Sequence, residues 1–282
     1  MALSLALSLR GPAAANDTLT AQSRFFVTSD GVRLHYLEAG PNYGHTIVFV
    51  PGWTMPAWIW GPQIVAFASS YHTVAFDPRG QGESEAPPSG YEPVRRSQDL
   101  AELIANLEPV PVLIVSWSLG VLDTLAYLRV HGDLNVAGLV LVDNSVGEEP
   151  PPPSQTPRPL PALPHAIAMH RFVAGMFHHQ QSADYLDRLT QATLHTPEYA
   201  SRALLAYPFP RSYWRDALYA TSRPVLYVVR PGWLSEQAAN LAHNRPGTQI
   251  AVFGEAGHAL FVDDAPRFNA LLARFITRTV WP

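Results

Sequence analysis

The chain has 282 residues, of which 47% are hydrophobic and 15% are charged, a balance that supplies a core and excludes a disordered protein. Its net charge of −4 offers no basic surface for nucleic acid or anionic lipid. Because the sequence contains no cysteine, disulfides and thiolate metal sites are excluded as well.

The first fifteen residues predict a secretory signal peptide. An apolar run at 3–9 is followed by three alanines at 13–15, the small-residue pattern of a cleavage site. Only the amino terminus supplies positive charge ahead of the run, so a disordered tail and a structural helix are the alternatives. Cleavage would imply a periplasmic or secreted protein, and otherwise we expect a cytoplasmic one. No segment reaches the roughly 20 apolar residues that a membrane span needs.

From residue 24 onward, strand and helix patterns alternate. Residues 25–28 and 33–37 alternate in polarity around a turn at 29–31 and predict a hairpin. Continuous apolar runs, typical of strands covered on both faces, occupy 46–50, 73–76, 112–115, 136–142, 225–229 and 249–253. Helical patterns occupy 97–107, 119–130, 235–244 and 268–279. This alternation predicts the α/β class, with helices on both faces of a mostly parallel sheet.

The alternation stops between residues 145 and 222. Eight prolines fall within 150–164 and cannot continue a helix or strand. Helical patterns follow at 165–178, 183–194 and 197–207. A long insertion between two strands commonly covers a site, so we predict a Pro-rich linker and helical cap over 145–222. The catalytic core would then comprise 24–144 and 223–282, although a surface excursion or flexible linker is the alternative.

Ser118 is the candidate nucleophile. The sequence SWSLG at 116–120 follows a predicted buried strand and opens a predicted helix, as in a nucleophile elbow. Small neighbours are needed there because the sharp turn brings backbone close to the serine. At the start of the helix, the amide of Leu119 could stabilise an oxyanion. A plain helix N-cap is the alternative role for Ser118.

His258 is the candidate general base. It lies in a loop after the last predicted strand, in the sequence GEAGH at 254–258, and parallel sheets keep their sites at such strand ends. A serine hydroxyl needs a base to take its proton, and an imidazole titrates in the suitable range. A second backbone amide for an oxyanion hole could come from the glycine-containing turn at 50–54 (VPGWT).

Five stretches resemble the α/β-hydrolase fold superfamily, and most closely its esterase, cofactor-free haloperoxidase and dehalogenase-like branch. They read FVPGWTMPAWIW, FDPRGQGES, SWSLG, GLVLVDNS and GEAGHALFVDDAPRFNALLARFI. The resemblance spans both parts of the core and fails over 145–222. It implies that Trp53, the residue after Gly52, gives the second oxyanion amide. It also implies a structural role for the loop 77–82 (DPRGQG).

The acid of the expected Ser–acid–His order is displaced. In most of these families it is an Asp after the next-to-last strand, where this chain has Trp233. Dehalogenase-like members carry it after the preceding strand instead, and the resemblance then assigns Asp143. Glu236 is the alternative acid. Asp263 and Asp264, which follow the base closely, are expected to cap the last helix before Pro266.

These features predict a serine hydrolase that cleaves an ester or similar acyl compound through an acyl-enzyme on Ser118, with no metal or organic cofactor. Aromatic residues, among them Trp53, Trp58 and Trp60, suggest a small or medium, mostly apolar acyl substrate. Perhydrolase or haloperoxidase-like activity, or a lyase reaction, would use the same residues. A non-catalytic ligand receptor on this fold is a further alternative, and the sequence predicts no particular oligomeric state.

Overall fold

The computed structural model describes residues 21–108, 111–153 and 163–282. The predicted signal peptide at 1–15 lies outside the described residues, and so does most of the proline-rich run. Both therefore stay predictions.

The centre of the fold is one sheet with the strand order β1-β2-β4-β3-β5-β6-β7-β8. β2 is antiparallel to β1 and β4, and the remaining neighbours pair in parallel. The strands are β1 (Gln22–Val27), β2 (Arg33–Ala39), β3 (Thr46–Val50), β4 (His72–Asp77), β5 (Val112–Trp117), β6 (Val136–Val142), β7 (Val225–Val229) and β8 (Gln249–Val252). The predicted hairpin and mostly parallel sheet are confirmed.

Burial along the strands follows the apolar runs except at one edge. β3, β4, β5 and β7 are buried along their whole length, as strands covered on both faces should be. In β8, however, both end residues are exposed. The prediction of two covered faces is wrong for β8 because this strand forms the edge of the sheet, where its cover is incomplete.

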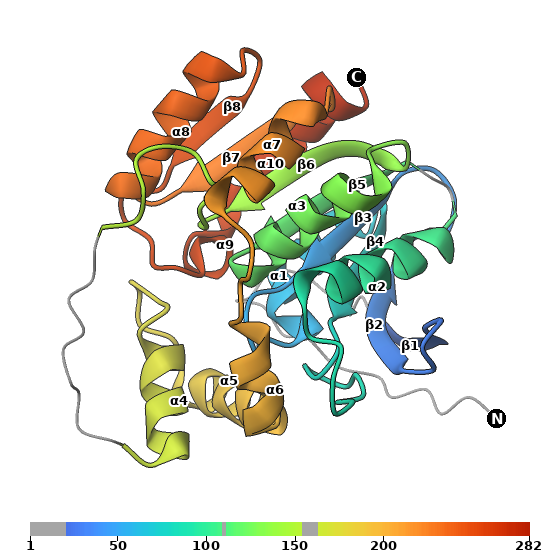
Figure 1. Ribbon diagram of the computed structural model, residues 1–282, viewed down its shortest axis with the longest axis vertical. Coiled ribbons are helices and arrows are strands. Elements are labelled where there is room, and N and C mark those ends of the chain that lie inside the picture. Colours follow the sequence, from blue (N-terminus) through green and yellow to red (C-terminus); the bar gives the residue numbers. More distant parts are fainter. Residues whose placement is uncertain (1–20, 109–110, 154–162) are drawn as a thin grey trace.

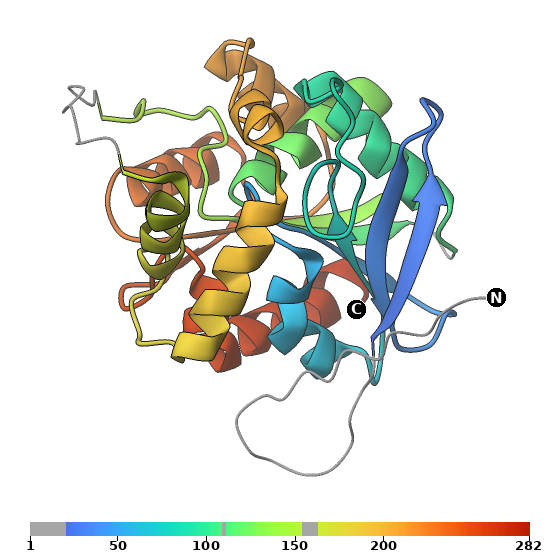
Figure 2. The same cartoon turned by 90° about the horizontal axis from the view of Figure 1, so that it is seen from below.

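Helices cover both faces of the sheet (Figures 1 and 2). Residues of α2, α3 and α8 share one apolar core with the sheet, and residues of η1, α1, α9 and α10 share the other. These helices are η1 (Ala57–Trp60), α1 (Gly61–Phe67), α2 (Pro93–Ala105), α3 (Leu119–His131), α8 (Trp233–Asn244), α9 (Leu260–Asp263) and α10 (Ala265–Phe275), followed by a π-helical turn, η2 (Ile276–Val280). The sequence pattern misses η1, α1 and α9, since one or two turns show little helical periodicity. Within the described ranges, no helix is long and apolar enough to cross a membrane.

Between β6 and β7 the chain makes an insertion whose described part contains α4 (His165–Ala174), α5 (Ala183–His195), α6 (Glu198–Leu204) and α7 (Arg211–Ala220). The first three lie within the ranges predicted to be helical apart from one residue at the end of α5, whereas no helix is predicted at α7. Trp214, Ala217 and Leu218 of α7 belong to the same apolar core as α3. Helices α4 to α6 lie together at one end of the molecule (Figure 1). The insertion thus returns to the core through α7.

Candidate active site

Ser118 stands at a strained turn between β5 and α3. Its φ of 53° and ψ of −121° lie outside the regions that residues with side chains favour. A β-carbon at Gly120 would lie 2.7 Å from the carbonyl oxygens of Val50 and Pro51, and one at Gly52 would lie 3.0 Å from Ser118 Cβ. Both glycines therefore permit the close backbone approach that an elbow requires.

His258 lies beside this serine, in the loop between β8 and α9. Its Nε2 is 2.9 Å from Ser118 Oγ, and 24% of its side chain is exposed. The indole Nε1 of Trp117 donates to the His258 carbonyl oxygen at 2.8 Å. The residue immediately before the serine therefore fixes the backbone of the histidine.

Asp143, and not Glu236, lies next to the imidazole. Asp143 Oδ2 is 2.6 Å from His258 Nδ1, and the carboxylate is fully buried. When Nδ1–H donates to Asp143, the lone pair of Nε2 is left to accept the proton of the Ser118 hydroxyl. Glu236 is exposed on α8. The structure therefore brings together Ser118, His258 and Asp143 as a hydrogen-bonded chain.

The two predicted oxyanion amides flank the elbow. Neither the amide of Trp53 nor that of Leu119 donates a hydrogen bond to another group within the described ranges. Leu119 is the first residue of α3, so its N–H is one of those that a helix leaves free. Gly52, next to Trp53, lies against Ser118. Both amides are thus available to an oxygen bound near Ser118 Oγ.

A buried glutamine supports the turn at 50–54, called here the oxyanion turn because the predicted oxyanion amide of Trp53 lies in it. Gln81 Oε1 accepts a hydrogen bond from the amide of Thr54, which has a φ of 60°. Gln81 is 1% exposed and belongs to the loop 77–82. The resemblance implies a structural role for this loop but does not indicate which group it holds.

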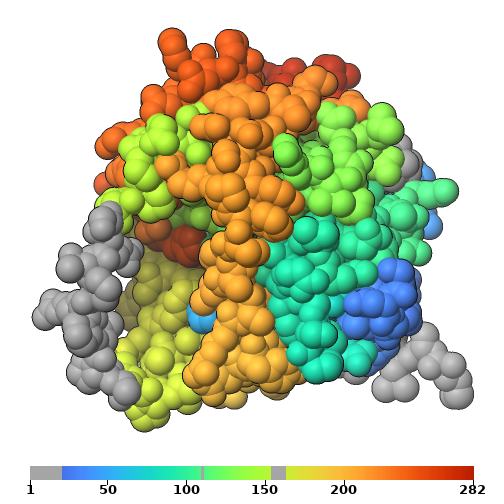
Figure 3. Space-filling model, viewed as in Figure 1, coloured from blue at the N-terminus to red at the C-terminus, as the bar shows by residue number. Residues whose placement is uncertain are grey.

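Helices of the insertion contact the oxyanion turn through the side chain of Trp53. Its indole Nε1 donates to the Ser201 carbonyl oxygen of α6 at 2.7 Å, and its ring meets that of Phe172 of α4 edge-on at 5.1 Å. The molecular surface is hollowed between α4 and the α5–α6 segment (Figure 3). This part of the insertion therefore borders the site.

Aromatic side chains continue from the core into the insertion. The ring of Tyr185 in α5 lies 5.8 Å from that of Trp58 and 5.9 Å from that of Phe177, edge-on to both. Burial raises the pKa of Tyr185, so its phenol stays protonated. Trp60, by contrast, is fully buried and stacks on Phe261 at 3.9 Å. Trp60 therefore belongs to the core, so counting it among the aromatic residues that suggest an apolar substrate is wrong.

The prediction that Asp263 caps the last helix is wrong, because its carboxylate binds amides of two loops instead. Its fully buried carboxylate accepts from the amides of Gly257 and His178, each at 2.6 Å, and from that of His179 at 3.2 Å. It is Asp264 that caps α10, accepting from the Arg267 amide at 3.4 Å. Asp263 therefore ties the loop of His258 to the segment after α4.

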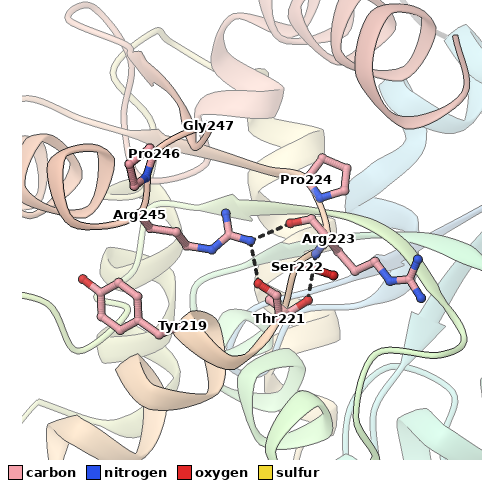
Figure 4. A pocket seen from close by; sticks show the side chains of 8 residues that line it. All are labelled: Tyr219, Thr221, Ser222, Arg223, Pro224, Arg245, Pro246 and Gly247. Carbon is pink, nitrogen blue, oxygen red and sulfur yellow. Dashed lines mark hydrogen bonds between the residues drawn. The ribbon is translucent and has the colours of Figure 1, made fainter.

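A separate pocket, of about 270 Å³, lies at the opposite end of β7 from Asp143 (Figure 4). Arg245 directs one terminal nitrogen at the carbonyl oxygens of Thr221 and Arg223, at 2.9 and 2.7 Å. The lining residues are Tyr219, Thr221, Ser222, Arg223, Pro224, Arg245, Pro246 and Gly247. These contacts fasten the start of β7 to the loop before β8. Within the described ranges, no group of three or more His, Cys, Asp or Glu side chains could hold a metal ion.

A serine at a strand-to-helix turn, linked to a histidine and an aspartate on a mostly parallel sheet, defines an α/β hydrolase. The sequence model of the alpha/beta hydrolase family matches residues 47–271. The chain belongs to this family.

Two relatives of known activity illustrate the similarity: one matches part of the chain, and the other matches most of it at a lower identity than the first. A non-heme chloroperoxidase from Streptomyces lividans is 33% identical over 116 residues, which are 41% of this chain and 42% of that protein. The chain thus spans less than half the length of this relative. N-formylmaleamate deformylase from Pseudomonas putida is 27% identical over 263 residues, 89% of this chain and 95% of the relative.

Solved structures agree over nearly the whole chain. An esterase from Rhodococcus sp. gives a TM-score of 0.75 at 25% identity, and the match covers 91% of this chain and 99% of the esterase chain. A bromoperoxidase from Bacillus anthracis gives a TM-score of 0.74 at 19% identity, with 90% and 100% covered. At 19% identity the second likeness shows the fold alone.

Proposed function

We propose that the chain is a serine hydrolase that cleaves a carboxylic ester or a similar acyl compound through an acyl-enzyme on Ser118. The observation that supports this proposal is the hydrogen-bonded chain from Ser118 Oγ through His258 to Asp143, with distances of 2.9 and 2.6 Å. A family member at 27% identity over most of the chain is a deformylase, which is consistent with acyl transfer.

The reaction would proceed in two acyl-transfer steps. Ser118 Oγ attacks the substrate carbonyl carbon while His258 Nε2 takes the hydroxyl proton, and Asp143 stabilises the resulting imidazolium. The amides of Trp53 and Leu119 donate to the carbonyl oxygen as it becomes negative. His258 then gives its proton to the departing alkoxide. Water, deprotonated by His258, releases the acid from Ser118.

The aromatic surroundings favour a small or medium, mostly apolar acyl group. Two edge-on ring contacts join the core to the insertion. Trp53 meets Phe172 of α4, and Trp58 meets Tyr185 of α5. Such rings supply apolar contact area with few polar groups to satisfy. A panel of p-nitrophenyl esters of increasing acyl length measures this preference as kcat/KM.

A fluorophosphonate probe tests the nucleophile directly. We expect covalent labelling of wild-type protein at Ser118, none in Ser118→Ala, and turnover of at least one ester lost in the same variant. Ser222→Ala is the matched control, because Ser222 is exposed and lines the pocket at the other end of β7. Absence of both labelling and turnover in the folded wild type would favour a ligand receptor.

Perhydrolysis is a second candidate, favoured by the activity of a relative. A bifunctional esterase/perhydrolase from Acinetobacter calcoaceticus is 28% identical over 119 residues, 42% of this chain and 43% of the relative. Hydrogen peroxide would attack the acyl-enzyme in place of water, so the acyl group would be released from Ser118 as a peracid. Peroxide-dependent bromination in acetate buffer, compared with ester turnover by the same sample, separates the two activities.

A further inference from the structure

The strand after which this fold commonly carries the acid is followed directly by an arginine. β6 and β7 are parallel neighbours, so the residues that follow them meet at one edge of the sheet. Asp143 follows β6 and Arg230 follows β7. The residue that follows β7 is thus not an acid but Arg230, and it contacts the carboxylate that follows β6.

Arg230 contacts both oxygens of Asp143. Its amide donates to Oδ1 at 3.0 Å, and its side-chain Nε donates to Oδ2 at 2.6 Å. Oδ2 also lies 2.6 Å from His258 Nδ1. Within the described ranges, the hydrogen-bond partners of this fully buried carboxylate are therefore His258 and Arg230. The side chain of Arg230 is 41% exposed.

We infer that Arg230 is a positioning residue for the displaced acid: its Nε–H holds Asp143 Oδ2 in line with His258 Nδ1. This inference rests on the proposed function of Ser118 and His258. A carboxylate rotates about its last bond over a broad, shallow energy profile, so its orientation must come from its hydrogen bonds. The backbone of Asp143 gives little help, because its φ of 50° is itself maintained by surrounding contacts.

The hydrogen bond, rather than the charge, is the feature that positions the acid. The Arg230 side chain is partly exposed, and solvent screens a positive charge in such a position so that its effect is weak. Nε, however, meets an oxygen that is removed from water, where an unmade hydrogen bond is costly. A neutral donor at the same place should therefore maintain the orientation.

Two substitutions separate the hydrogen bond from the charge. Arg230→Gln places a neutral N–H donor as many bonds from Cα as Nε, whereas Arg230→Met places a methyl group there. We expect kcat per labelled active site to stay within about threefold of wild type in Arg230→Gln. In Arg230→Met it should fall about tenfold or more, yet less than the roughly 10⁴-fold seen when a triad aspartate is replaced. In an Asp143→Asn background, Arg230→Met should have no additional effect.

The histidine proton gives a readout that needs no substrate. In proton NMR spectra of the folded protein, the Nδ1–H of His258 should resonate at low field in wild type and Arg230→Gln, and shift or broaden in Arg230→Met. Equal rates and equal spectra in both variants would overturn the inference, as would equal losses in both. If the spectra change as expected while no ester is hydrolysed, the positioning role stands and the proposed function fails.

Discussion

Three residues other than glycine have a positive φ within the described ranges: Thr54, Ser118 and Asp143. They belong to the turn 50–54, to the turn between β5 and α3 and to the end of β6, so backbone strain is concentrated at the candidate site. Each such residue costs about 1–3 kcal/mol and persists only where its surroundings determine its conformation.

Each strained residue is held by a polar side chain from another loop or strand end. Gln81 accepts from the Thr54 amide, and Asn144 Nδ2 donates to the Ser118 carbonyl oxygen at 2.7 Å. Arg230 donates to the carboxylate of Asp143. The geometry of the candidate site therefore depends on residues that need not touch a substrate.

Asp143→Asn tests the displaced acid. The asparagine keeps the size of the side chain but cannot stabilise an imidazolium, so kcat should fall by up to about 10⁴-fold with the fold retained. Ester turnover and the melting temperature Tm, measured on the same sample, check this. Glu236→Gln is the control and should leave the rate unchanged. The reverse pattern would transfer the acid role to Glu236.

Gln81→Leu tests the support of the oxyanion turn. Without the glutamine oxygen the Thr54 amide is left unpaired, and the adjacent Trp53 amide should lose its alignment. Since small misplacements cost much in catalysis, we expect kcat to fall by about tenfold while KM changes little. Gln98→Leu removes the same side chain from a partly exposed position on α2 and should have no effect. A wild-type kcat in Gln81→Leu would remove this role.

Local motifs predicted the site better than they predicted its supports. The placement of Ser118 and His258 follows from residues adjacent in sequence, and the resemblance gave Asp143 through its place after a strand. Gln81 and Arg230 act on atoms 27 and 87 positions away, and one sequence carries no signal for such contacts. The short helices η1, α1 and α9 were missed for a different reason, because so few turns show no clear period.

At the scale of elements, the insertion is joined to the loop of the base. The amide of Ala259 donates to the Met176 carbonyl oxygen at 3.0 Å. A β-carbon at Gly257 would lie 2.3 Å from that same oxygen. The residues on either side of His258 thus pack against the segment after α4. Asp263 links the two segments by accepting hydrogen bonds from the amides of Gly257 and His178.

Asp263→Asn tests this connection. An asparagine of the same shape turns an N–H toward an amide N–H on one side, so at least one buried donor loses its acceptor at a cost of about 1–3 kcal/mol. We expect a lower Tm, and also a lower kcat per labelled active site because the loop of His258 loosens. Hydrogen exchange should quicken at residues 176–181.

Asp264→Asn is the matched control for that variant. Asparagine serves as a helix N-cap about as well as aspartate does, so α10 and the rate should be preserved. A loss of kcat in Asp264→Asn equal to that in Asp263→Asn would mean that the two neighbouring carboxylates act only through general stability.

At the scale of the whole molecule, the folded state shifts the pKa values of carboxyl groups in opposite directions. Burial raises the pKa of Asp99 and that of Asp123. Four carboxyl groups have pKa values lowered by hydrogen bonds that outweigh their burial, namely Asp30, Glu38, Glu102 and Glu148. The second set makes the folded state bind fewer protons than the unfolded chain, so it stabilises the protein only while ionised.

Glu38 offers a test at the edge of the sheet. It accepts from Arg24 of β1 and from His72 of β4, each at 2.8 Å, and joins three strands. Burial alone would raise the pKa of Glu38, but these hydrogen bonds lower it from the ordinary value of 4.5. Its contribution should therefore be present above pH 4.5 and be lost as the pH falls through the lower, folded-state value.

Glu38→Gln should accordingly reduce the free energy of unfolding by about 1 kcal/mol at pH 7, and by less as the pH is lowered below 4.5. Urea unfolding at a series of pH values measures the difference. Glu92→Gln replaces an exposed glutamate whose side chain makes no cap hydrogen bond on α2, and it should track wild type throughout. A constant difference between Glu38→Gln and wild type across that range would mean that Glu38 stabilises the edge through packing, because only an ionisation-linked contribution disappears with acid.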